Sequence, residues 1–111
     1  MKGPLVSVIT AVYNGAATLE ATIQSVIGQT YPHVELVIVD GGSTDGSQVI
    51  AERYKAHIGS FVSEPDKGVY DAMNKGVRMA RGEWLYFLGS DDLLVDEGVL
   101  NMLFSGSFRE D

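Results

Sequence analysis

The sequence predicts an α/β fold: an open, mostly parallel sheet with helices on both faces, built from about four successive strand–helix units. Short runs of valine and isoleucine are apolar at both odd and even positions, which indicates strands covered on both faces. Segments with the apolar spacing of a helix lie between these runs. With 111 residues, 45% of them hydrophobic, the chain has room for one domain around a single core.

The elements follow one another in a regular order. Two strong strands are predicted over residues 5–12 (LVSVITAV) and 34–40 (VELVIVD), and two weaker ones over 61–63 (FVS) and 84–88 (WLYFL). One helix is predicted after each strand, with core-facing positions at Leu19, Ile23, Val26 and Ile27; at Ile50 and Tyr54; at Tyr70, Met73, Val77 and Ala80; and at Val99, Leu100, Leu103 and Phe104. Short links with right-handed crossovers then predict a parallel sheet.

Charge and composition exclude several classes of protein. Eight Lys and Arg against fifteen Asp and Glu give a net charge of -7, which disfavours binding to nucleic acids and to anionic lipids. Without cysteine there is no disulfide framework, thiolate zinc site or cysteine nucleophile. The segment MKGPLVSVIT lacks the cleavage pattern of a signal peptide, and no later stretch is long enough to cross a bilayer. We therefore expect a cytoplasmic protein, with a peripheral position at the inner face of the membrane as the alternative for the full-length protein.

Polar segments follow each predicted strand. Tyr13 and Asn14 follow the first, DGGSTDG (40–46) the second, EPDKG (64–68) the third and GSDD (89–92) the fourth. The carboxyl ends of parallel strands share one edge of the sheet, and open α/β sheets bind their ligands at that edge. We therefore expect the four segments to converge on one crevice.

The adjacent carboxylates Asp91 and Asp92 could hold a hard divalent cation, Mg²⁺ or Mn²⁺, which prefers carboxylate oxygens and completes its shell with water and substrate phosphates. Such a metal would allow a protein with a net charge of -7 to accept an anionic diphosphate. The alternative is a solvated acidic pair that caps the following helix.

The other segments have the chemistry to bind a nucleotide. Gly42 permits close backbone approach, while Asp40 and Ser43 offer hydrogen bonds to a base or ribose. Tyr13 offers an aromatic face to a nucleobase. Residues 63–76 add polar side chains for hydrogen bonding or charge pairing to a nucleotide, namely Asp66, Lys67, Asp71, Asn74 and Lys75. The alternatives are a glycine turn that caps the second helix, a packed tyrosine and a solvated helix face.

Four segments occur together and in this order: VSVITAVYN, SVIGQTYPHVELVIVDGGSTDGS, SEPDKGVYDAMNKGVRMARGEW and YFLGSDDLL. They resemble the family 2 glycosyltransferases of the GT-A fold over nearly the whole chain. The resemblance implies a Rossmann-like nucleotide-binding half with its strands in the order third, second, first, fourth. It also implies inverting transfer of a sugar from a nucleotide diphosphate sugar, a uridine diphosphate sugar being favoured, to an acceptor.

The resemblance also assigns residues to the site. It places the first-strand segment beside the base, with Ala11, Tyr13 and Asn14, and it makes Asp40 the acidic residue of the nucleotide loop. GSDD corresponds to the DXD region, which faces ribose, diphosphate and metal through Ser90, Asp91 and Asp92. Two glycines depart from the pattern: Gly41 stands where many relatives carry a second acidic residue for base recognition, and Gly89 where relatives often carry the first Asp of the DXD motif.

The segment SEPDKGVYDAMNKG is similar to enzymes that build bacterial surface polysaccharides, which implies a sugar or lipid-linked glycan as acceptor. Residues 1–111 then form the donor domain, and we expect the acceptor site and an Asp or Glu general base beyond residue 111. We expect this part alone to be inactive as a transferase. It would leave residues 84–88 as an apolar sheet edge, so we expect self-association, most simply a homodimer.

Two other classes share parts of this pattern. A phosphoacceptor receiver domain is also acidic, α/β and dependent on Mg²⁺, but it needs an acidic pair after its first strand and a lysine after a fifth. Here Tyr13 and Asn14 follow the first strand. A noncatalytic nucleotide-binding module would share every donor-site residue and would differ in lacking turnover.

Overall fold

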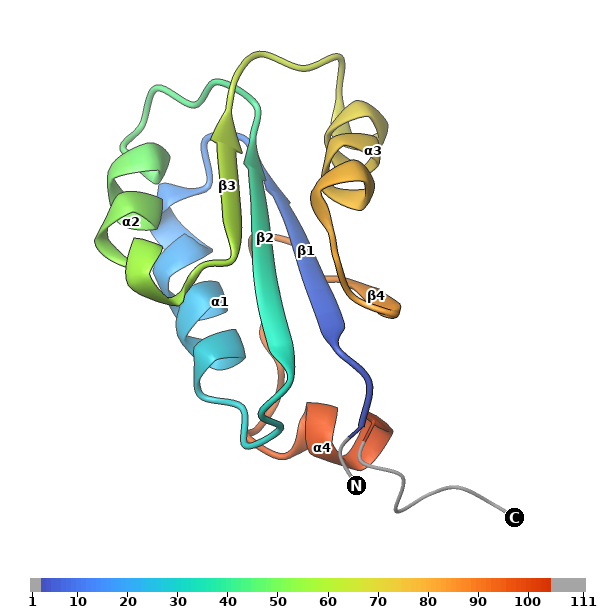
Figure 1. The fold of residues 1–111 in the computed structure, drawn as a ribbon. Helices are drawn as coiled ribbons and strands as arrows, with labels where there is room; N and C mark the ends of the chain where they lie inside the picture. The colour runs from blue at the N-terminus through green and yellow to red at the C-terminus, as the bar shows by residue number, and fades with distance from the viewer. Residues whose placement is uncertain (1–2, 105–111) are drawn as a thin grey trace.

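The computed structural model describes residues 3–104. Its centre is a four-stranded parallel sheet in the order β3-β2-β1-β4 (Figure 1), which confirms the predicted fold class and strand order. The strands are β1 (Val6–Val12), β2 (Val34–Asp40), β3 (Ser60–Ser63) and β4 (Trp84–Phe87). The helices are α1 (Ala16–Ile27), α2 (Ser47–Arg53), the short 3₁₀ helix η1 (Lys55–His57), α3 (Val69–Met79) and α4 (Val99–Phe104).

Helices cover both faces of the sheet, with α1 and α2 on one face and α3 on the other (Figure 1). Side chains alternate along β1, so Val6 and Val8 enter the larger core with α1 and α2. Ile9 instead enters a smaller core with Ala72 of α3. Both β1 and β2 are buried along almost their whole length, because each has a helix on either face and a strand on either side.

The face of α3 that packs on the sheet is not the one predicted from apolar spacing. Tyr70 and Val77 were expected in the core, but they are 80% and 41% exposed. The buried positions are Ala72 and Gly76, and a Cβ on Gly76 would lie 2.4 Å from Cγ2 of Ile9. The helix therefore uses its small residues to lie close to the sheet, which the spacing of large apolar residues does not reveal.

Within residues 3–104, strand β4 lies at one end of the sheet and pairs with β1 alone. Its side chains Trp84, Leu85 and Phe87 are 57%, 39% and 45% exposed. Self-association through this apolar edge stays a prediction, which light scattering over a concentration series would test. Within residues 3–104, no helix combines the length and the apolar character needed to cross a membrane.

Candidate functional site

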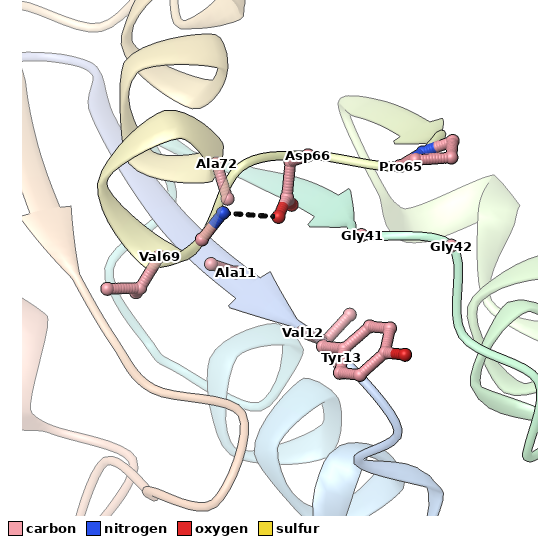
Figure 2. Close-up of a pocket in the computed structure, with 10 residues that line it drawn as sticks. Ala11, Val12, Tyr13, Gly41, Gly42, Pro65, Asp66, Val69 and Ala72 are labelled. Carbon is pink, nitrogen blue, oxygen red and sulfur yellow. Dashed lines mark hydrogen bonds between the residues drawn. The ribbon is translucent and has the colours of Figure 1, made fainter.

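A cavity of about 640 Å³ opens at the carboxyl ends of β1 and β2, beside the loop that leads from β3 into α3 (Figure 2). This is the edge of the sheet at which the sequence predicted a crevice. Its volume is that of a small-molecule site. It is lined by Ala11, Val12, Tyr13, Gly41, Gly42, Pro65, Asp66, Gly68, Val69 and Ala72.

Four of the predicted site residues line this cavity: Ala11, Tyr13, Gly42 and Asp66. The Tyr13 side chain is 66% exposed, so it is not the packed tyrosine of the alternative interpretation. Asp66 is the one charged side chain among the described residues that line the cavity, and its Oδ1 accepts a hydrogen bond from the backbone N–H of Gly68 at 3.0 Å (Figure 2). The cavity wall therefore combines the exposed aromatic ring of Tyr13 with the carboxylate of Asp66.

The remaining lining residues were missed by sequence reasoning. They are glycines or apolar residues without a chemical signature of their own: Val12, Gly41, Pro65, Gly68, Val69 and Ala72. Their position was the only signal, since they end β1, follow β2 or β3, or lie in the first turn of α3. Gly42 and Gly68 have φ of 90° and 117°, a conformation that favours glycine and lets the backbone form the cavity wall.

Asp40 ends β2 but does not line the cavity, because its side chain is fully buried at 0% exposure. Its Oδ2 accepts hydrogen bonds from the backbone N–H groups of Gly42 (3.0 Å) and Ser43 (2.9 Å) and from the Ser63 hydroxyl (2.8 Å). Its Oδ1 accepts one from the Ser43 hydroxyl at 2.6 Å. Asp40 and Ser43 thus hold the loop after β2 against β3, and this loop supplies part of the cavity wall.

Asn14 has a structural position at the start of α1. It adopts a left-handed φ of 52°, its Oδ1 accepts from the N–H of Thr44 at 2.9 Å, and its own N–H donates to the Ser43 hydroxyl at 2.7 Å. The N–H of Gly15 donates to the Ser47 hydroxyl at 3.1 Å, and that of Ala16, the first residue of the helix, donates to Asp45 Oδ2 at 2.9 Å. This hydrogen bond and those from Ser47 lower the pKa of the Asp45 carboxyl. The loop after β2 therefore caps α1.

The acidic turn after β4 lies on the other side of β1. The Asp91 and Asp92 carboxylates are exposed. Oδ1 of Asp91 and Oδ2 of Asp92 lie 3.1 and 3.0 Å from the point where a Cβ on Gly89 would stand. The two carboxylates therefore converge over Gly89, and a side chain at position 89 would occupy the space between them.

Two threonines of α1 hold this turn in place. The buried Thr22 hydroxyl lies 2.9 Å from the carbonyl oxygen of Ser90 and 2.7 Å from that of Asp92. The Thr18 hydroxyl donates to the Ser90 carbonyl at 2.8 Å. Sequence reasoning missed both threonines, because nothing in a helix sequence indicates which loop lies against it.

The donor set fits a cation that binds partly through its substrate. Within residues 3–104 there is no group of three or more His, Cys, Asp or Glu side chains placed to hold a metal ion. Asp91 and Asp92 each place one hard carboxylate oxygen near Gly89, 3.1 and 3.0 Å from where a Cβ would stand. Mg²⁺ or Mn²⁺ at a nucleotide site commonly uses one or two carboxylates with water and phosphates. The residues present match that type of site and not a complete protein cage.

The remaining predicted residues lie outside the cavity lining. Lys67 and Asn74 are exposed. Lys75 pairs with Glu64 at 2.9 Å and lies 3.9 Å from Asp71, and the hydrogen bond to Glu64 raises the pKa of Lys75. From this whole segment, Asp66 is the charged group that reaches the cavity.

Comparisons with known proteins agree with this geometry. Residues 7–105 match the family described as Glycosyl transferase family 2. The chain is 45% identical over 103 residues to a PGL/p-HBAD biosynthesis glycosyltransferase of Mycobacterium bovis (strain BCG / Pasteur 1173P2), covering 90% of this chain and 40% of that protein. It is 42% identical over 92 residues to the putative teichuronic acid biosynthesis glycosyltransferase TuaG of Bacillus subtilis (strain 168), covering 80% of this chain and 36% of that protein.

Solved structures share the fold. The mannosyltransferase PcManGT from Pyrobaculum calidifontis, in complex with GDP-Man and Mn²⁺, matches with a TM-score of 0.82 and 31% identity, over 87% of this chain and 30% of that one. TarS residues 1–349 from S. aureus, in complex with UDP-GlcNAc, match with a TM-score of 0.80 and 28% identity, over 93% of this chain and 30% of that one. The chain spans less than half the length of these relatives. It belongs to glycosyltransferase family 2 and has the GT-A fold of that family.

Proposed function

We propose that this chain is the donor-binding part of an inverting glycosyltransferase, which moves a sugar from a nucleoside diphosphate sugar to a sugar or lipid-linked glycan acceptor in bacterial surface-glycan synthesis. One observation carries the proposal: a cavity with an aromatic wall and a converging carboxylate pair lie on the same sheet edge, on opposite sides of the carboxyl end of β1. The names of the relatives support the glycan pathway, and the neighbours solved with GDP-Man or UDP-GlcNAc support the donor class.

In this proposal, different residues bind the nucleobase and the diphosphate. Tyr13 offers its exposed ring to the nucleobase, and the loop held by Asp40 forms the wall beside it. Asp91 and Asp92 would hold Mg²⁺ or Mn²⁺ next to the diphosphate. When bound, the cation supplies positive charge that offsets the two phosphates and the charge that grows on the leaving nucleoside diphosphate. Mn²⁺ accompanies GDP-Man in the PcManGT complex, which supports this choice of metal.

Calorimetric titration of the full chain with UDP, GDP, dTDP, CDP and ADP tests the proposal, each nucleotide being run with Mn²⁺ and again with chelator. We expect at least one of them to bind with Mn²⁺ and to bind more weakly once the metal is removed. Absence of binding, or equal affinity with chelator, would contradict the proposal. Transfer of labelled sugar to a glycan acceptor then separates a transferase from a noncatalytic nucleotide-binding module, which would bind without turnover.

A further inference from the structure

We propose that Asp66 selects the nucleobase by accepting a hydrogen bond from the ring N–H at the centre of its Watson–Crick edge, so that uracil, thymine and guanine are accepted and cytosine and adenine rejected. This inference rests on the proposed function, since it takes the cavity as a nucleotide site. It adds which bases the site recognises and which side chain makes the choice.

Asp66 has an oxygen left over for a ligand. One oxygen, Oδ1, accepts from Gly68 N–H at 3.0 Å, whereas Oδ2 receives no hydrogen bond from any residue between 3 and 104. No lysine or arginine of that range lies within ion-pairing distance of the carboxylate. A carboxylate that is only partly satisfied, at the wall of a largely apolar cavity, is the type of group that fixes ligand orientation.

Gly41 keeps this oxygen accessible. A Cβ at position 41 would lie 2.7 Å from Asp66 Oδ2, closer than a real contact allows. Because Gly41 has no side chain, the carboxylate extends from the loop after β3 to the space beside the end of β2 (Figure 2). The Asp66 carboxylate, from the loop after β3, thus occupies the space that a side chain at position 41, in the loop after β2, would take.

The order of the strands places the base, and not the diphosphate, at Asp66. The acidic turn follows β4, while Asp66 follows β3, and two strands lie between them. Neighbouring strands are about 4.8 Å apart, so the two carboxylate groups serve opposite ends of a ligand. With the phosphates beside Asp91 and Asp92, the far end of a nucleotide is its base, and Tyr13 lies between the two ends.

The chemistry of the carboxylate sets the preference. An ionised carboxylate only accepts hydrogen bonds. Uracil, thymine and guanine carry a hydrogen on the central ring nitrogen of that edge, and guanine adds a neighbouring amino group. In cytosine and adenine the same nitrogen carries a lone pair, which repels the carboxylate even though an amino group stands next to it. A site that uses such a bond leaves its own polar group unpaired with the wrong ligand.

Calorimetry of the full chain with the five nucleoside diphosphates and Mn²⁺ tests this, comparing wild type with Asp66→Asn. The amide keeps an oxygen for Gly68 and offers an N–H to the lone pair of cytosine or adenine. We expect UDP and GDP to lose about tenfold or more in affinity, as for a hydrogen bond to a charged group, while CDP and ADP lose nothing or gain. Asp96→Asn is the matched control, because Asp96 likewise caps a glycine two residues on, Gly98 at 2.8 Å, and does not line the cavity.

Gly41→Ala gives a second, independent test, since its methyl group would displace the Asp66 carboxylate without backbone strain. It should reproduce the loss for UDP and GDP, and have no further effect when combined with Asp66→Asn. If wild type binds all bases alike, or Asp66→Asn weakens all of them equally, the inference is overturned and the proposed function stands. If no nucleoside diphosphate binds wild type with Mn²⁺, both are overturned.

Discussion

The segments that follow β2 and β4 flank β1 on its two sides, and both are acidic and rich in glycine. At the end of β2, Asp40 is fully buried and accepts four hydrogen bonds, from the backbone of Gly42 and Ser43 and from the hydroxyls of Ser43 and Ser63. After β4, Asp91 and Asp92 are exposed, and neither carboxylate receives a hydrogen bond from the described residues 3–104. Similar residues therefore have opposite surroundings: the Asp40 carboxylate is buried and holds the loop that lines the cavity, while the Asp91 and Asp92 carboxylates face solvent.

The difference follows from the position of each strand. β2 has a strand on either side, so the hydroxyl of Ser63 on β3 reaches Asp40 and completes its burial. Within residues 3–104, β4 pairs with β1 alone, and the turn after β4 is held by its backbone carbonyls through Thr18 and Thr22, so its carboxylates are exposed in the described part of the chain. Mutations can test whether these surroundings give the carboxylates separate functions.

The largest expected effect is on stability. Asp40→Ala would leave two backbone N–H groups and two hydroxyls without their acceptor in a buried site, so we expect a loss of about 3 kcal/mol or more in the free energy of unfolding. Urea unfolding followed by circular dichroism measures this. A variant as stable as wild type but deficient in nucleotide binding would instead make Asp40 a ligand contact.

The acidic pair should behave in the reverse way. Asp91→Asn combined with Asp92→Asn should change the free energy of unfolding by less than about 0.5 kcal/mol, because both side chains are exposed. The same variant should lose the Mn²⁺ dependence of nucleotide binding, as measured by calorimetry with and without chelator. The neighbouring exposed pair, changed to Asp96→Asn with Glu97→Gln, is the control and should retain that dependence. Retained dependence in the first variant would remove the pair from the metal site.

The contrast between the two segments also shows how much of the fold and of the candidate site could be predicted from the sequence. The valine and isoleucine runs located β1 and β2 closely, because burial on both faces leaves a strong signal. The strand ends indicated the edge at which the cavity lies, and Tyr13 and Asp66 line that cavity. The burial of Asp40 could not be inferred, since it depends on Ser63 from a strand more than twenty residues away.

A smaller set of misses has the same physical origin. The packing face of α3 was wrong because Ala72 and Gly76 make the contact, and small residues carry little apolar signal. Gly41 lines the cavity through its backbone and Pro65 through its ring, and no sequence motif predicts either contact. The sequence was enough to predict which segments are helices and which are strands. It was not enough to predict contacts between distant residues or the close approach of one backbone segment to another.

A more modest effect is expected from the threonine that positions the acidic turn. Thr22→Val keeps the shape of the side chain but removes the hydroxyl that lies between the carbonyls of Ser90 and Asp92. Outer residues that orient metal ligands typically contribute about tenfold or more in metal affinity, and we expect that loss in a Mn²⁺ titration. Thr18→Val is the matched control with a weaker effect, because Thr22 still holds Ser90. If both variants bind Mn²⁺ as wild type does, the turn positions itself.

The smallest effect concerns a structural carboxylate at the other end of the sheet, Glu35, which is 6% exposed. Burial raises its pKa, but hydrogen bonds from the Arg81 backbone, the Ser7 hydroxyl and the Arg81 side chain outweigh this, and the pKa in the folded protein lies below the ordinary 4.5. The unfolded chain then binds the proton more tightly, so the stability that Glu35 contributes is present above pH 4.5 and is lost as the pH falls through the lower folded pKa.

We expect Glu35→Gln to flatten the fall of the free energy of unfolding with decreasing pH in this range, as measured by urea unfolding. Glu83→Gln, at an exposed position, is the control for removing one charge. An unchanged pH profile in Glu35→Gln would mean that the hydrogen bonds to Glu35 stabilise the neutral acid as much as the carboxylate, and that Glu35 does not contribute to the pH dependence of stability.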